Sequence, residues 1–198
     1  MLIEQGQVPA EDLPLAEFAA HLRVGTGFDP DDLQAKLLEA YFRSALAVVE
    51  GRTGKALLSR RFLWSGPAWT GGGSAQALPT APVTEVIEVA LVNASGQRQI
   101  IPTARWSLRQ DLHRPRIEAV GPDLPPVPAG GRAEVVFQGG FGATWQAIPA
   151  ELRQAVLLMA AEFYELRHAG PEAMGGLPAT VLALIEGWRT VRLFGGRA

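Results

Sequence analysis

The hydrophobic pattern of this chain is most pronounced at residues 148–168. Apolar residues recur there at i, i+3 and i+4 spacing, which predicts a helix with one continuous apolar face. Leu157, Leu158 and Ala161 lie off that face and are apolar as well. A helix that is apolar on every side is usually buried on every side. We therefore expect residues 148–168 to form the central helix of a bundle, or a helix shared with a neighbouring subunit.

Three further helices are predicted from apolar spacing and from helix boundary signals. The first covers residues 13–23, and the last begins at Pro178. Asp29-Pro30-Asp31-Asp32 is a strong helix start, with Asp29 as N-cap, so a second helix is predicted to run to about Arg52 and to be followed by Gly54. The apolar face of this second helix comprises Leu33, Leu37, Tyr41, Ser44 and Val48, and is widened by Leu38, Phe42, Ala45 and Val49.

Between the second helix and the central helix, the apolar segments are shorter and have the pattern of β-strands. Strand-forming residues from 84 to 101 are interrupted by the turn Asn93-Ala94-Ser95-Gly96, which predicts a hairpin. Residues 65–82 and 121–131 are rich in glycine or proline and are expected to be loops. The remaining strands are expected at residues 56–64, 106–112, 116–120 and 132–138.

The predicted fold class is therefore α+β, an antiparallel-type bundle of about four helices with an inserted β-rich subdomain and an extended C-terminal tail. Residues 1–12 are expected to be a polar, poorly ordered leader. The expected division assigns residues 1–55 to the N-terminal helices, 56–138 to the β-rich insertion, 139–188 to the C-terminal helices and 189–198 to the tail.

Composition narrows the functional classes. The chain has no cysteine, which excludes disulfides, thiolate chemistry and cysteine-ligated zinc. No apolar run reaches transmembrane length, and the N-terminus lacks the basic and apolar regions of a signal peptide, so we expect no membrane partner. The net charge of −2 argues against a dedicated nucleic-acid binder.

Charge is unevenly distributed along the chain. Residues 1–50 hold nine acidic and three basic side chains, whereas residues 51–150 hold six acidic and ten basic ones. This distribution is either chance or a sign that the acidic end of one copy meets the basic middle of the next, because complementary charges set register in an assembly. The candidate subunit-interface residues are Asp29, Asp31, Asp32, Arg60, Arg61, Arg105 and Arg109.

The same β-rich region combines arginine with tryptophan. Arginines crowd the sequence around Trp64, Trp69 and Trp106. Such a combination can stack on nucleic-acid bases. Tryptophan and arginine are equally favoured as anchors of protein–protein interfaces. The low net charge favours a protein partner.

Motifs for catalysis or metal binding are sparse. Glu165 and His168 have the i, i+3 spacing of a di-iron ligand pair, but no second Glu-x-x-His occurs. Asp111 and His113 could form half of an acid–base pair, but the chain has no G-x-S-x-G serine elbow, no P-loop and no dinucleotide fingerprint. We therefore expect no enzyme activity, no cofactor and no metal ion.

Three parts of the chain, taken together, resemble a known family. They are PLAEFAAHLRV (14–24) with the aspartate-rich helix start and VVEGRTGKAL (48–57), then VVFQGGFG (135–142) with IPAELRQAVLLMAAEFYELR (148–167), and finally LPATVLALIEGWR (177–189). In order and spacing they are similar to the head–tail connector, or adaptor, proteins of long-tailed phages. The similar branch has a β insertion and also occurs in phage-like gene transfer agents.

The resemblance implies a structural virion protein at the head–tail junction, assembled in the bacterial cytoplasm. Such proteins form a ring, usually a dodecamer, beneath the portal, where they extend the DNA channel and dock a tail-side stopper or terminator protein. DNA passes through the ring without sequence-specific binding. A terminal segment commonly grips the portal, and the candidate portal-binding residues here are Arg189, Arg192, Leu193 and Phe194.

The alternative is a small soluble enzyme or ligand-binding protein that uses the arginine- and tryptophan-rich β insertion. This alternative requires a concave pocket with convergent polar groups and strongly shifted titratable residues.

Overall fold

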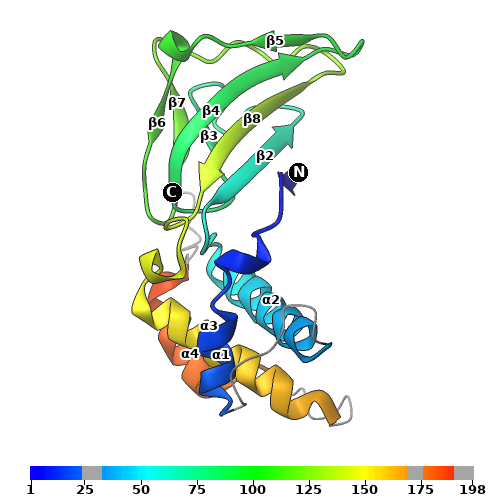
Figure 1. Ribbon diagram of the computed structural model, residues 1–198. Coiled ribbons are helices and arrows are strands. Elements are labelled where there is room, and N and C mark those ends of the chain that lie inside the picture. Colours follow the sequence, from blue (N-terminus) through cyan, green and yellow to red (C-terminus); the bar gives the residue numbers. More distant parts are fainter. Residues whose placement is uncertain (24–32, 169–175, 190–198) are drawn as a thin grey trace. The chain divides into compact units, whose positions relative to one another are not determined.

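The computed structural model describes residues 1–23, 33–168 and 176–189, which Figure 1 shows as ribbons. The chain forms two compact units. The β unit comprises residues 1–12 and 55–147, and the helical unit comprises residues 13–54 and 148–198. Each unit therefore combines two separate stretches of the sequence. The predicted α+β class is confirmed.

Four α-helices make up the described part of the helical unit. They are α1 (Leu15–His21), α2 (Leu33–Thr53), α3 (Ala150–Glu165) and α4 (Ala179–Ile185). Helix α3 packs against each of the other three, as expected for a central helix. Its residues Leu157 and Met159 are buried, but Leu158 and Ala161 are only half-buried. The chain therefore covers most of this helix, and not all of it.

Helix α2 buries only part of its predicted apolar face. Leu38 and Phe42 are at most 1% exposed, and the Phe42 ring lies 5.8 Å from the ring of Phe18 in α1. Leu33 is 83% exposed and Leu37 is 41% exposed. These two leucines belong to the predicted apolar face but not to the core, because α1 and α3 pack on the side of the helix that bears Phe42.

The β unit, every residue of which is described, consists of eight strands in two antiparallel sheets. The strands are β1 (Leu2–Glu4), β2 (Arg60–Gly66), β3 (Ala75–Ala77), β4 (Val83–Val92), β5 (Arg98–Ile100), β6 (Trp106–Arg109), β7 (Arg116–Ala119) and β8 (Arg132–Gly139). The larger sheet has the order β1-β2-β8-β4-β5, and the smaller has the order β3-β7-β6. Strands β4 and β5 confirm the predicted hairpin.

Strand alternation places large apolar side chains of both sheets in one core. Phe62, Phe137 and Val86 are neighbours in register across β2, β8 and β4. The rings of Phe62 and Phe137 stack with their centroids 5.6 Å apart. Ile117 of the smaller sheet is fully buried in the same cluster. The unit is therefore a two-layer structure around a shared core.

Three predictions for this unit were wrong in detail. The expected leader contains strand β1, which pairs with β2 at the sheet edge, and the Met1 amino group donates to the Ser65 carbonyl oxygen at 2.6 Å. The strand expected at residues 56–64 begins at Arg60, because residues 56–58 are buried and bond instead to separate loops, as in the bond from the Ala56 N–H to Ala81. The loop expected at residues 65–82 contains the three-residue strand β3.

Candidate assembly surfaces

The three tryptophans of the β unit belong to its core and not to its surface. Trp64, Trp69 and Trp106 are each at most 9% exposed. The indole N–H of Trp69 donates to Pro125 at 2.8 Å, and that of Trp106 donates to Ile101 at 3.2 Å. The hypothesis of an exposed arginine–tryptophan surface is therefore wrong for the tryptophans, since their strands and loops turn them inward.

The four candidate interface arginines differ in their surroundings. Arg61, Arg105 and Arg109 are exposed. Arg60 is held within the chain, because its Nε lies 2.8 Å from a Glu4 carboxylate oxygen and its guanidinium lies 5.0 Å from the centre of the Phe62 ring. The three exposed arginines can therefore meet a partner without breaking a contact of this kind.

The exposed arginines lie toward different ends of the β unit. Arg61 is in register with Gln138, which is in register with Glu85 near the start of β4. Arg109 adjoins Gln110, whose amide donates to Thr84 at the same end of that strand. Arg105 precedes β6, and its guanidinium donates to the Asp123 carbonyl oxygen at 3.3 Å. The structure thus brings Arg61 and Arg109 to one end and leaves Arg105 at the other end of β6.

Most of the remaining candidates lie outside the described residues. These are the acidic interface candidates Asp29, Asp31 and Asp32 and the portal-binding candidates Arg192, Leu193 and Phe194. Arg189 is described, and it is exposed. Its guanidinium lies 3.2 Å from the Glu186 carboxylate.

An ionic cluster on the larger sheet was missed by the sequence reasoning. The Glu134 carboxylate is 6% exposed and lies 2.5 Å from Arg98 and 2.7 Å from Arg132. Arg98 also pairs with Glu88. The four charged side chains come from strands β4, β5 and β8, which lie side by side in the larger sheet. Because side chains alternate along a strand, the sequence predicts that Glu134 and Val135 lie on opposite faces of β8. It does not show which strands lie beside β8, so the arginine partners of Glu134 could not be predicted.

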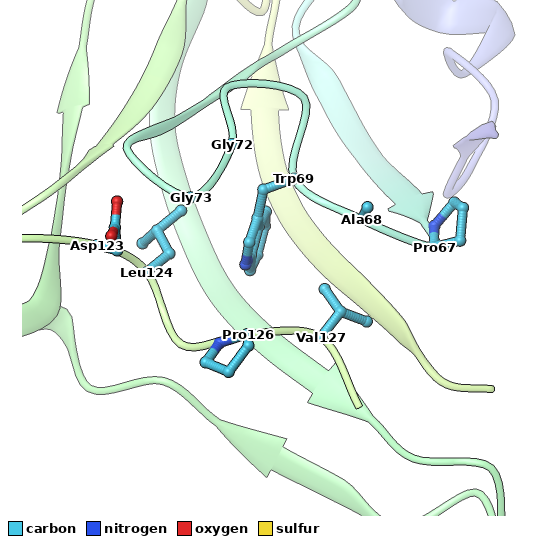
Figure 2. Close-up of a pocket in the computed structure, with 9 residues that line it drawn as sticks. All are labelled: Pro67, Ala68, Trp69, Gly72, Gly73, Asp123, Leu124, Pro126 and Val127. Carbon is cyan, nitrogen blue, oxygen red and sulfur yellow. The ribbon is translucent and has the colours of Figure 1, made fainter. Parts of the chain in front are cut away.

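A pocket of about 370 Å³ lies between the glycine-rich and proline-rich loops of the β unit, and Figure 2 shows its lining. Trp69 forms one wall, and Leu124 and Val127 come from the facing loop. The lining contains one ionisable side chain, Asp123, and no second acid, base or nucleophile beside it. Gly73 has a φ of +104°, and a Cβ there would lie 3.2 Å from Asp123, so glycine permits the close approach of the loops. This lining does not provide the convergent polar groups that the enzyme alternative requires.

Lys55 and the Asp111–His113 pair form a structural anchor. The Lys55 ammonium is buried, donates to the Leu112 carbonyl oxygen at 2.5 Å and lies 3.3 Å from His113 Nδ1. Burial lowers the pKa of Lys55 because desolvation disfavours its charged form, and the Asp111 carboxylate opposes part of this effect.

The pKa of Asp111 is lowered mainly because its carboxylate accepts the backbone N–H groups of His113 and Arg114, each at 2.7 Å. Asp111 therefore closes a turn at residues 111–114. Lys55, near the start of the second stretch of the β unit, holds this turn in place by its hydrogen bond to Leu112. Both side chains have structural partners that account for their positions.

Within residues 1–23, 33–168 and 176–189, no three His, Asp or Glu side chains are grouped so that they could hold a metal ion. No helix in the described part of the chain has the length and apolar character needed to cross a membrane.

No protein-family model matches the chain, and no curated protein matches it. Chains in solved structures do match, over the full length of both chains. A chain in the neck of an empty GTA particle, computed with C6 symmetry, is 50% identical with a TM-score of 0.88. A chain in the virion of a native gene transfer agent (GTA) particle is 50% identical with a TM-score of 0.86. A chain in the neck of a native GTA particle, computed with C12 symmetry, is 48% identical with a TM-score of 0.84.

Proposed function

Because this chain belongs to the family of neck proteins of gene transfer agent particles, we propose that it is the head–tail adaptor of such a particle. In this function, twelve copies form a ring beneath the portal, extend the DNA channel and dock a stopper or terminator protein on the tail side. DNA passes through the ring without sequence-specific binding, in keeping with a net charge of −2.

The observation that supports this proposal most directly is the similarity to neck chains over the full length of both chains, at 48–50% identity. The similarity includes both the helical unit and the β unit, so it is not a likeness of one common motif. The chain is accordingly a structural protein of the virion neck.

A ring of identical copies requires that one patch of each subunit meets a different patch of the next. The neck structures of the two relatives were computed with C6 and C12 symmetry. We assign one such pair of patches to the acidic N-terminal part of this chain and to the exposed arginines at one end of its β unit. The proposed pairs join Asp29, Asp31 and Asp32 of one copy to Arg61 and Arg109 of the next, whereas Arg105, at the other end of β6, is left out of this patch. Arg60 supports this surface from within, through Glu4.

The contact with the portal is assigned to the C-terminal segment 189–198. It combines the cationic Arg189 and Arg192 with the apolar Leu193 and Phe194. Arginine with an adjoining aromatic or aliphatic side chain is a typical anchor at protein interfaces.

Binding to a purified portal ring tests this assignment. A chain that ends at Trp188 is expected to keep its circular dichroism spectrum and melting temperature and to lose at least tenfold in affinity for the portal. Arg192→Glu should weaken portal binding in the full chain, whereas the matched variant Arg52→Glu, at an exposed arginine with no assigned contact, should not. Undiminished binding by the truncated chain would refute the tail assignment. Failure of the full chain to bind the portal would refute the adaptor function.

A further inference from the structure

The side of α2 that faces away from the core carries a continuous uncharged stripe, which the exposed Lys36 borders near the start of the helix. Exposed residues recur on it at alternating spacings of four and three, which keeps them on one side of a helix. An exposed helix face usually bears charged and polar residues. This α2 stripe consists of Leu33, Leu37, Ala40, Ser44, Ala47 and Gly51, all of which are exposed.

The α2 stripe has the properties of a packing surface. Leu33 and Leu37 are among the large apolar side chains that the described chain leaves exposed. Ser44 is the one polar member, and its hydroxyl donates to the Ala40 carbonyl oxygen at 2.8 Å, so the hydroxyl proton has a partner within the helix. The stripe also narrows from leucine to glycine, which would let a second helix approach more closely toward the end of α2.

Gly51 is an independent indication of a close partner. Glycine weakens a helix relative to alanine. Apart from the adjacent backbone of α2 itself, a Cβ at this position would meet no atom of the described residues within 4 Å. The described chain therefore gives no steric reason for glycine here, whereas a closely packed neighbour would.

A second uncharged face lies on α4. Ala179, Leu182 and Ala183 are exposed at i, i+3 and i+4 spacing, and we call them the α4 face. Val181 and Ile185 on the other side of this helix are fully buried. Since α2 and α4 each pack against α3, the α2 stripe and the α4 face are two different patches of one unit.

We infer that the α2 stripe of one copy packs against the α4 face of the next copy in the ring, an inference that rests on the proposed function. Two different patches are what a closed ring requires. The bulky leucines of the stripe also complement the alanines of the α4 face. Each patch has a polar rim that is paired within the chain, Glu39 with Arg43 at 2.7 Å beside α2 and Glu186 with Arg189 at 3.2 Å beside α4. An apolar centre with a polar rim is the usual anatomy of an interface.

The size of this contact determines when it forms. From Leu33 to Gly51 the stripe is roughly 27 Å long and roughly 10 Å wide, so it covers on the order of 300 Å². A stable interface covers about 800 Å² on each partner. The contact should therefore form within the assembled neck, together with other contacts, and not between dilute copies.

Cross-linking in assembled particles tests the inference, because the natural chain has no cysteine. Particles are produced with the double variant Ser44→Cys/Ala183→Cys and are treated with a short bismaleimide. Ser44 lies near the middle of the α2 stripe, and Ala183 is one of the three residues of the α4 face. Denaturing gels should show a ladder of linked copies. Each single variant should give monomer only. The matched double variant Ser44→Cys/Gln154→Cys, whose second site is exposed on α3, should also give no ladder.

A charge variant provides a second measurement that does not depend on cross-linking geometry. Ala40→Arg should reduce the copies per particle at least tenfold, and Gln154→Arg should change them less than twofold, with the melting temperatures of both chains unchanged. Normal incorporation of Ala40→Arg would overturn the inference, as would incorporation of Ser44→Cys/Ala183→Cys without a ladder. A dimer from Ser44→Cys alone would also overturn it, because that product requires two α2 stripes to meet. If the unaltered chain is missing from the particles, the proposed function itself has failed.

Discussion

The two sides of α2 predict opposite effects of the same kind of substitution. Phe42 is fully buried against Phe18, so Phe42→Ala should lower the free energy of unfolding by about 3–5 kcal/mol. Leu33 is 83% exposed, which leaves about a sixth of its surface covered. Full burial of a leucine contributes about 1.5–3 kcal/mol, so Leu33→Ala should cost at most about 0.5 kcal/mol.

Urea unfolding followed by circular dichroism at 222 nm measures this difference, since that signal reports the helices. Phe42→Ala should shift the midpoint to lower urea with an unchanged slope, and Leu33→Ala should leave the midpoint nearly unchanged. Equal destabilisation by both substitutions would refute the described orientation of α2. It would also remove the basis for an exposed α2 stripe, because Leu33 would then belong to the core of the isolated chain.

Three further predictions concern single sites. Gly51→Ala should raise the free energy of unfolding of the isolated chain by about 0.5–1 kcal/mol, measured in urea, because the added Cβ would meet no described residue beyond the backbone of its own helix; a lower free energy of unfolding would contradict this open environment. Glu134→Gln should cost about 1.5–3 kcal/mol by removing the carboxylate that Arg98 and Arg132 share, and a neutral result would show that the cluster adds nothing. Because burial lowers the pKa of Lys55 in the folded chain, the unfolded chain binds this proton more tightly, so stability should rise with pH from that lowered pKa up to the ordinary value of about 10.4. Urea midpoints across that range should lose this rise in Lys55→Met and keep it in the control Lys36→Met.

The elements that could be predicted are those whose boundaries are marked by nearby residues, such as a turn, a glycine or the end of an apolar run. The turn at Asn93–Gly96 fixed the hairpin of β4 and β5, and the continuous apolar run of α3 identified the central helix. Gly54, with a φ of +67°, follows α2 as its position predicted. Strand β1 could not be found in this way, because it is ordered by pairing with β2, about sixty residues further along the chain.

The surfaces were harder to predict than the elements. Apolar periodicity showed that α2 is apolar over a wide arc, but it did not show which part the chain itself covers. The outcome, with Phe42 inside and Leu33 outside, depends on where α1 and α3 pack. Similarly, tryptophan beside arginine was consistent with either a surface or a core, and the inward direction of Trp64 follows from its register with Val135 in β8. Side-chain direction in such cases is decided by tertiary packing.

The adaptor ring can be observed by native mass spectrometry of necks isolated from particles that contain an affinity-tagged copy of this chain. We expect one complex that contains the portal and twelve copies of the chain, with the tail-side protein attached. Particles that form normally without the tagged chain in their necks, or necks that hold it as isolated single copies, would contradict it.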